Sequence, residues 1–139
     1  MEWIIQSEKD LKNIATKIIP TLKKGDIVAL EGDLGAGKTT FVRTLIRTLT
    51  SSDVEVPSPT FTLLQTYTTP NFLLYHFDFY RLKNPEEAYE IGIEEAFADG
   101  VSFIEWPQKI GSLLPKNHKT ISIDILSNGS RRIVYEGET

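Results

Sequence analysis

Hydrophobic residues near the start of the chain follow first a strand-like spacing and then a helical one. Trp3, Ile4 and Ile5 form a short, β-prone apolar run that predicts a first strand. Ser7 is a hydroxyl cap for the helix expected next, with an acid three residues later, and Pro20 is expected to end or bend that helix. One face of this helix is apolar and consists of Leu11, Ile14, Ala15, Ile18, Ile19 and Leu22.

A buried strand and a second helix are predicted next, separated by a glycine-rich segment. Residues 26–30 read Asp-Ile-Val-Ala-Leu, which is apolar enough for a strand inside a sheet. Phe41, Leu45 and Leu49 recur every fourth residue, as one face of a helix beginning at Thr39 would. The sequence therefore predicts the order strand, glycine-rich loop, helix.

The second half of the chain alternates between predicted strands and short helices. In order, we expect a polar loop over 50–59, strands over 61–66 and 72–80, helices over 84–92 and 94–98, and a strand over 101–105. The chain is expected to close with a β-hairpin whose turn is Asn128-Gly129 and whose return strand covers 133–135. Because strands and helices mix throughout, the fold class is α/β.

Composition narrows the class of protein without changing this picture. The 139 residues are 40% hydrophobic and 24% charged, as in a soluble globular protein, and no linker or repeat divides them, so we expect one domain over 1–139. The net charge is −4, whereas a protein that grips nucleic acid by itself is more often basic. Any RNA is therefore expected to be held by another subunit.

The composition also predicts the cellular compartment of the protein. The chain has no cysteine, which excludes a disulfide scaffold and a thiolate metal site and fits a reducing compartment. No apolar run approaches the length of a membrane span, and Met1-Glu2-Trp3 lacks the basic and apolar parts of a signal peptide. We therefore expect a cytoplasmic protein without membrane contact.

The glycine-rich segment contains the pattern Gly-x-x-x-x-Gly-Lys-Thr from Gly32 to Thr39, which is the phosphate-binding loop, or P-loop, of many nucleotide hydrolases. Glycines let backbone N–H groups turn inward onto phosphate oxygens, Lys38 reaches the β- and γ-phosphates, and the Thr39 hydroxyl can ligate Mg²⁺. The alternative is a glycine-rich turn that merely precedes a helix. The predicted strand before the loop and helix after it favour the P-loop.

A P-loop works with a carboxylate that helps to hold Mg²⁺, usually at the end of a hydrophobic strand. Two residues fit that position, Glu105 after residues 101–104 and Asp78 after residues 73–77, and the pattern leaves the choice between them open. Strand alternation would place His76 on the same face as Asp78. Arg81 either approaches a phosphate or forms a surface ion pair.

Three further segments have a functional and a structural interpretation. Thr60, in the stretch Pro-Ser-Pro-Thr from Pro57, either faces the metal and the γ-phosphate or simply belongs to a proline-rich loop that enters a strand. Trp106 either covers the nucleotide or belongs to the core. Arg131 and Arg132 follow the terminal hairpin turn and, from the residues alone, are expected to be solvated.

Taken together, these motifs resemble the TsaE (YjeE) family of bacterial ATPases, which act in threonylcarbamoyladenosine modification of tRNA. The resemblance covers essentially the whole chain, and its order and spacing fit. It is carried by Glu-Gly-Asp-Leu-Gly-Ala-Gly-Lys-Thr-Thr from Glu31, Ser-Pro-Thr-Phe-Thr-Leu from Ser58, His-Phe-Asp-Phe-Tyr-Arg-Leu from His76, and Glu-Trp at Glu105.

The resemblance implies a small P-loop domain with a mixed sheet flanked by helices, weak intrinsic ATPase activity, and the partner proteins TsaD and TsaB, through which tRNA would be contacted. It implies metal ligation by Thr39 and Glu105, an essential Asp78 and a switch-like Thr60. Ser7, Trp106 and Arg131 are the other nucleotide contacts expected. The implied triphosphate loop comprises Asp33, Leu34, Gly35, Ala36, Gly37, Lys38, Thr39 and Thr40. Gln108 departs from the family, which often has Glu there.

On this basis Lys38, Asp78 and Thr60 are the expected catalytic residues, with Lys38 neutralising charge at the β–γ bridge and Asp78 orienting the attacking water, aided by Thr60. ATP and Mg²⁺ are the expected ligands. Two alternatives remain: a small-molecule kinase, which usually needs an arginine-bearing lid, and a nucleotide-gated binding module in which hydrolysis is incidental. A signalling GTPase is disfavoured because no Asn-Lys-x-Asp segment is present.

Overall fold

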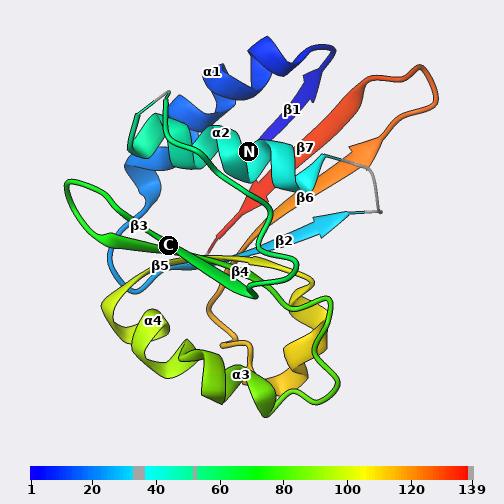
Figure 1. The fold of residues 1–139 in the computed structure, drawn as a ribbon. Helices are drawn as coiled ribbons and strands as arrows, with labels where there is room; N and C mark the ends of the chain where they lie inside the picture. The colour runs from blue at the N-terminus through cyan, green and yellow to red at the C-terminus, as the bar shows by residue number, and fades with distance from the viewer. Residues whose placement is uncertain (33–36, 52, 138–139) are drawn as a thin grey trace.

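The protein is built around one seven-stranded sheet (Figure 1). The structure is a computed structural model that describes residues 1–32, 37–51 and 53–137. The strands are β1 (Glu2–Ile5), β2 (Ile27–Gly32), β3 (Leu64–Thr68), β4 (Leu73–Asp78), β5 (Gly100–Glu105), β6 (Lys119–Ile125) and β7 (Arg131–Glu136). They lie side by side in the order β1-β7-β6-β2-β5-β4-β3.

The four central strands are parallel and the outer ones antiparallel, which makes the sheet mixed as expected. β2 pairs in parallel with both β5 and β6, and β4 pairs in parallel with β5. β7 and β1 continue one side and β3 the other, all through antiparallel pairs. As a result, β2, β4 and β5 all end at the same edge of the sheet.

Helices cover both faces of the sheet (Figure 1). α1 (Glu8–Ile18), the 3₁₀ turn η1 (Ile19–Thr21) and α2 (Lys38–Leu49) lie on one side. α3 (Glu87–Ile91), α4 (Ile93–Asp99) and the 3₁₀ segment η2 (Pro107–Leu113) lie on the other. None of the helices in the described residues is long and apolar enough to cross a membrane.

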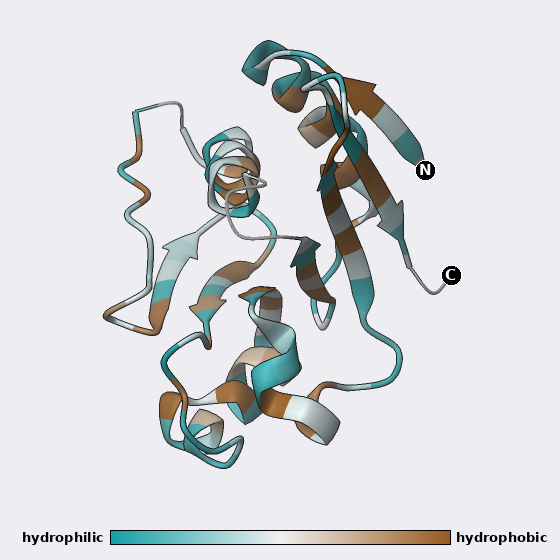
Figure 2. Ribbon diagram, turned by 90° about the vertical axis from the view of Figure 1, so that its right-hand side faces the viewer, coloured by the Kyte–Doolittle hydropathy of each residue, from teal (hydrophilic) through white to brown (hydrophobic). Residues whose placement is uncertain are grey.

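Each face of the sheet has its own hydrophobic core, because strands buried on both sides carry apolar residues in both directions. Between α1, α2 and the sheet, Phe41, Leu45 and Phe103 are fully buried. Against α3, α4 and η2, Phe77 and Ile104 are fully buried in a second cluster. Figure 2 shows the brown, hydrophobic stretches of the central strands between the two helical layers.

Most predicted elements are confirmed. The helix after Ser7, the strand before the P-loop, the helix after it and the strand that ends at Glu105 lie where the pattern placed them, within a residue or two. Pro20 lies in the short 3₁₀ turn η1, directly after α1 ends at Ile18. Asn128-Gly129 forms the turn of the β6–β7 hairpin, with Gly129 at φ 86°.

One predicted strand is misplaced. Residues 61–66 were expected to be a strand, but β3 covers Leu64–Thr68, and the segment before it is a turn closed by a 2.6 Å hydrogen bond from the Leu63 N–H to the Pro59 carbonyl. The 3₁₀ segment η2 was not predicted at all. β4 ends at Asp78 rather than Tyr80.

Candidate functional site

The site lies at the edge of the sheet where three parallel strands end. β2 ends at Gly32, β4 at Asp78 and β5 at Glu105. Asp78 and Glu105 are direct neighbours in the β4–β5 register, so their two carboxylates sit side by side at this edge. In open α/β sheets, ligands bind in the crevice beyond the carboxyl ends of the strands.

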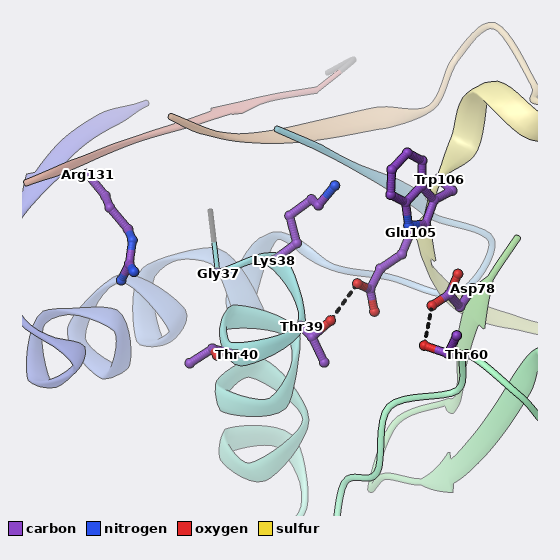
Figure 3. A pocket seen from close by; sticks show the side chains of 9 residues that line it. All are labelled: Gly37, Lys38, Thr39, Thr40, Thr60, Asp78, Glu105, Trp106 and Arg131. Carbon is purple, nitrogen blue, oxygen red and sulfur yellow. Dashed lines mark hydrogen bonds between the residues drawn. The ribbon is translucent and has the colours of Figure 1, made fainter. Parts of the chain in front are cut away.

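The first turn of α2 faces the same edge. Gly37 is its N-cap at φ 99°, and Lys38 and Thr39 are its first two residues. A helix N-terminus offers free N–H groups and a partial positive charge to an anion. The cleft in front of it has a volume of about 360 Å³ (Figure 3) and is lined by Gly37, Lys38, Thr39, Thr40, Thr60, Asp78, Glu105, Trp106 and Arg131.

The four loop residues Asp33, Leu34, Gly35 and Ala36 lie outside the described residues, so their expected contacts to a nucleotide stay predictions. The glycine before them is described. Gly32 has φ 141°, and a Cβ atom there would lie 2.3 Å from the Ile123 carbonyl oxygen of β6. Both the backbone conformation and the close approach of β6 therefore require glycine at the start of the loop.

Thr39 and Glu105 are joined directly. The Thr39 hydroxyl donates a 2.7 Å hydrogen bond to Oε1 of Glu105, across the gap between α2 and β5 (Figure 3). The Glu105 residue is only 3% exposed. Burial acts to raise the pKa of its carboxyl, but hydrogen bonds from His76 and Thr39 and the charge of Lys38 outweigh burial, and the pKa lies below its ordinary value. Glu105 is therefore held ionised.

His76 supports Glu105 from behind. Its Nε2 atom lies 2.6 Å from Oε2 of Glu105, and the ring is fully buried. Nδ1 has no hydrogen-bond partner within the described residues. This favours the tautomer with its hydrogen on Nε2, which donates to the carboxylate, because a buried N–H without an acceptor would be costly. His76 was expected to share a face with Asp78, but its hydrogen-bond partner is Glu105.

Asp78 is tied to the proline-rich segment. The Thr60 hydroxyl donates a 3.1 Å hydrogen bond to Oδ2 of Asp78 (Figure 3), and the Tyr80 N–H donates to Oδ1 at 2.9 Å. The Ser58 and Thr60 hydroxyls lie 2.8 Å apart. Thr60 thus faces the site, although the segment is a turn rather than the start of a strand.

Lys38 and Trp106 meet at the back of the cleft. Nζ of Lys38 donates a 2.8 Å hydrogen bond to the Gly32 carbonyl and lies 4.5 Å from the centroid of the Trp106 ring. Trp106 itself adopts φ 61°, which is uncommon for a bulky residue, and its ring lies against that of Tyr80 with the centroids 4.8 Å apart and the planes tilted by 56°. Trp106 therefore lines the cleft and also packs against the second hydrophobic cluster, and its contact to a nucleotide stays a prediction.

Arg131 lines the cleft and is only partly exposed to solvent, which differs from the expectation from its position after a turn. It is half-buried and reaches from β7 toward α2, with its guanidinium carbon 3.6 Å from where a Cβ of Gly37 would lie. Figure 3 places it on the far side of Gly37 from the Thr39–Glu105 pair. Arg132, by contrast, forms a surface ion pair with Glu2 at 2.9 Å.

Two expected residues lie outside the cleft lining. Ser7 is exposed at the N-cap of α1, just beyond Ile5, which pairs with Arg131 in the sheet. It thus lies near the Arg131 side of the site without lining the cleft. Within the described residues, Arg81 forms no ion pair with a carboxylate and does not line the cleft. Its guanidinium lies over the Phe61 ring instead.

Tyr80 was not predicted as a site residue. With Thr60, Asp78 and Trp106 it lines a second cleft of about 270 Å³ that adjoins the first. An aromatic residue two positions after a strand-end aspartate was the available signal. The pairing of His76 with Glu105 was also missed, because the neighbours of a strand cannot be read from its own residues.

The residues present fit a magnesium ion. Mg²⁺ prefers hard oxygen ligands, and in nucleotide sites it takes one or two carboxylates or hydroxyls together with phosphate oxygens and water. Thr39 and Glu105 offer two such oxygens at 2.7 Å from each other, and the Asp78 carboxylate lies on the neighbouring strand. Thr39 and Glu105 are therefore the ligands expected to hold the ion.

Comparison with known proteins gives consistent results. The model of the family described as threonylcarbamoyl adenosine biosynthesis protein TsaE matches residues 5–133. A Rickettsia bellii protein named tRNA threonylcarbamoyladenosine biosynthesis protein TsaE is 46% identical over 130 residues, 94% of this chain and 90% of the relative. A Treponema pallidum protein of the same name is 40% identical, over 96% of this chain and 98% of the relative.

A solved structure shares the fold. The crystal structure of Bacillus subtilis YdiB superposes with a TM-score of 0.80 and 31% sequence identity, over 99% of this chain and 84% of that one. This likeness agrees with the mixed α/β sheet and the P-loop arrangement described above.

Proposed function

The chain belongs to the TsaE family, and from that premise we propose that it binds ATP with Mg²⁺ and hydrolyses it slowly in the service of tRNA threonylcarbamoyladenosine biosynthesis. Its relatives are named for that pathway. The nucleotide, the ion and the hydrolysis are the parts of the proposal that rest on the site.

One observation supports the nucleotide site above the others. The Thr39 hydroxyl and the Glu105 carboxylate meet at 2.7 Å in front of the first turn of α2, where the P-loop motif ends. A phosphate-binding helix start, a hydroxyl and a strand-end carboxylate are the parts from which P-loop proteins assemble a magnesium–triphosphate site.

In this proposal each side chain has a distinct role. The N–H groups at the start of α2 and the Lys38 ammonium bind phosphate oxygens, and Lys38 leaves the Gly32 carbonyl to do so. Asp78, fixed through both oxygens by Thr60 and the Tyr80 N–H, orients a water molecule toward the γ-phosphate. Arg131, on the other side of Gly37, is placed to contact the remainder of the nucleotide.

Magnesium, when bound by Thr39 and Glu105, would neutralise charge on the phosphate oxygens. His76 holds the Glu105 carboxylate in position through a 2.6 Å contact. Such support of a ligand by a second residue is common at metal sites and fixes the orientation of the carboxylate.

The partners belong to the same proposal. Weak intrinsic hydrolysis would be raised by TsaD and TsaB, and tRNA would be contacted only through them. The net charge of −4 supports this division, since a chain that binds tRNA alone usually carries a basic surface. A cytoplasmic location, where tRNA is modified, completes the proposal.

Isothermal calorimetry with ATP and Mg²⁺, followed by turnover assays with and without TsaD and TsaB, tests the proposal. Unaltered protein is expected to bind ATP, and Lys38→Ala is expected to lose measurable turnover, because positioning and charge stabilisation account for most of phosphoryl-transfer catalysis. Near-normal turnover in Lys38→Ala would exclude this mechanism. Failure of the folded protein to bind any adenine or guanine nucleotide, even with TsaD and TsaB present, would exclude the function.

A further inference from the structure

We propose that Phe61, Tyr80, Arg81 and Lys109, which we call the aromatic–cationic patch, form the surface on which a partner protein docks. The partner surface that fits it is an apolar pocket rimmed by carboxylates. This inference rests on the proposed function, because it identifies the surface through which a partner reaches the nucleotide site.

Phe61 is the starting point. Its residue is 81% exposed, more than any other large hydrophobic residue in the described part of the chain. Single exposed apolar residues are ordinary on protein surfaces. Phe61 is not single, however, because Tyr80 is also 52% exposed and lines a cleft together with Thr60, the residue directly before Phe61.

Phe61 is held outward by fixed backbone. Pro59 and Leu63 close the turn around it with a 2.6 Å hydrogen bond, and the Leu63 carbonyl accepts the Asp78 N–H at 3.0 Å. Thr60, the residue before it, is anchored to Asp78. A preformed aromatic side chain loses little conformational entropy on binding, which favours its use as an anchor.

The other members of the patch are packed against aromatic rings. The guanidinium carbon of Arg81 lies 4.9 Å from the Phe61 ring centroid, and Nζ of Lys109 lies 5.8 Å from that of Tyr80. The Tyr80 ring in turn lies against Trp106, which lines the proposed nucleotide cleft. The patch is therefore continuous with the wall of the site.

Charge and residue type indicate the chemistry of the partner. Arg81 and Lys109 are exposed and form no ion pair with any carboxylate in the described residues. Two cations without an ion pair, each beside an exposed aromatic ring, suit a partner surface that carries carboxylates. Aromatic residues and arginine are the types that most often dominate binding energy at protein interfaces.

Two other occupants fit less well. RNA is usually gripped through many phosphate contacts, whereas this patch offers two cations on an acidic protein. A second copy of the chain, docked patch to patch, would bring Arg81 and Lys109 against their own counterparts, which is electrostatically unfavourable.

Docking at this place has a consequence for the site. Phe61 directly follows Thr60, so a partner that clamps Phe61 also fixes the hydrogen bond between Thr60 and Asp78. If partner binding tightens nucleotide binding through this contact, then nucleotide must tighten partner binding by the same factor. The patch thus links the state of the nucleotide site to the partner.

The test measures binding of the TsaD–TsaB complex from the same organism, with ATP and Mg²⁺ present. Phe61→Ala and Arg81→Glu are expected each to raise the dissociation constant at least about tenfold, the scale of an interface anchor. Arg81→Glu is expected to weaken binding more than Arg81→Ala, because it repels the carboxylates of the partner. Equal effects of the two Arg81 variants on the dissociation constant would overturn the proposal that carboxylates rim the pocket of the partner.

Matched controls are available elsewhere on the surface. Tyr89→Ala removes another exposed aromatic residue, 46% exposed on α3, and Lys116→Glu reverses another exposed cation. Both are expected to bind the complex within about twofold of the unaltered protein, as surface changes away from an interface do. Calorimetry should show that all variants bind nucleotide like the unaltered protein, which confirms that they are folded.

The outcomes separate the two proposals. If unaltered protein binds TsaD–TsaB and the patch variants bind equally well, the inference is overturned while the proposed function stands. If unaltered protein does not bind the complex at all, the proposed partnership is wrong and the inference falls with it. Two further results, each with TsaD–TsaB binding unchanged, would overturn the inference. If Phe61→Ala abolished binding of the protein to labelled tRNA, the patch would belong to an RNA-binding surface. If Phe61→Ala converted a dimer of the protein to a monomer, the patch would belong to a self-association surface.

Discussion

The ammonium group of Lys38 lies 4.5 Å from the centroid of the Trp106 ring while it donates a hydrogen bond to the Gly32 carbonyl. A cation–π contact of this kind contributes about 1 kcal/mol, whereas a hydrogen bond between charged groups contributes roughly 1.5–3 kcal/mol. A bound triphosphate should therefore draw Lys38 away from Trp106. The fluorescence of Trp106 should therefore report that movement.

The first prediction follows from this contact. Addition of ATP and Mg²⁺ is expected to change the intrinsic fluorescence, because Trp106 loses its cation. The chain has only two tryptophans, so Trp3→Phe should keep the signal and Trp106→Phe should abolish it while nucleotide still binds by calorimetry. A nucleotide-dependent signal that survives in Trp106→Phe and vanishes in Trp3→Phe would contradict the predicted movement.

The two neighbouring carboxylates are expected to differ in function. Glu105 contacts Thr39, whereas Asp78 contacts Thr60. Glu105→Ala should weaken Mg²⁺-dependent ATP binding more than Asp78→Ala, and Asp78→Ala should lower turnover with little change in affinity. Calorimetry with and without Mg²⁺, paired with single-turnover hydrolysis, distinguishes the two. The opposite ranking would exchange their roles.

The sequence was sufficient to identify the P-loop motif and to predict two acids at strand ends, because these signals are local. Glycines, a lysine and a hydroxyl at fixed spacing indicate a phosphate loop, and Glu105 and Asp78 each follow an apolar run that became a strand. Which of the two acids contacts Thr39 could not be predicted from the local sequence. It depends on which strand lies next to β2, and β5 rather than β4 does.

The errors have the same origin in tertiary contacts. Residues 61–66 alternate and are β-prone, yet the hydrogen bond of Leu63 to Pro59 and that of Thr60 to Asp78 hold the segment as a turn. Arg131 follows a turn and looks solvated, but the β1–β7–β6 order of strands brings it toward α2. Local propensity carries no information about either contact.

The partly buried ion pair between Lys119 and Asp26 gives a prediction for stability and pH. Nζ of Lys119 lies 2.8 Å from Oδ2 of Asp26 and also donates to the Thr21 carbonyl. Burial lowers the pKa of Lys119, but its hydrogen bond to Asp26 and the nearby negative charges outweigh burial and raise it above the ordinary 10.5. The charged lysine is therefore favoured by folding.

The pKa of Lys119 is higher in the folded protein than in the unfolded chain. The charged Lys119 therefore stabilises the folded protein fully below pH 10.5, and this stabilisation is lost as the pH rises through the folded pKa. Lys119→Met is expected to lower the free energy of unfolding by about 1 kcal/mol at neutral pH, because the half-buried Asp26 carboxylate loses its ion pair and keeps only the hydrogen bond from the Lys23 N–H. Urea unfolding at pH 7 and at successive values above 10.5 should show this difference shrinking. A difference that grows with pH would contradict the assignment.

The last prediction concerns Gly32, where the loop leaves the sheet. A Cβ atom there would lie 2.3 Å from the Ile123 carbonyl oxygen, at φ 141°. Gly32→Ala is therefore expected to force β2 and β6 apart, to lower the free energy of unfolding by more than about 2 kcal/mol, and to weaken nucleotide binding with it.

Gly25→Ala is the matched control, because Gly25 also has a positive φ, 98°, but nothing lies within 4 Å of the added Cβ. It should cost only the conformational strain, about 1 kcal/mol. Urea denaturation gives the two free energies, and calorimetry with ATP gives the affinities. If the two alanine variants lost equal stability, backbone conformation alone would explain the glycine at the start of the loop. A larger loss in Gly32→Ala assigns the excess to the close approach of β6, which then helps to set the position of the loop that receives the phosphates.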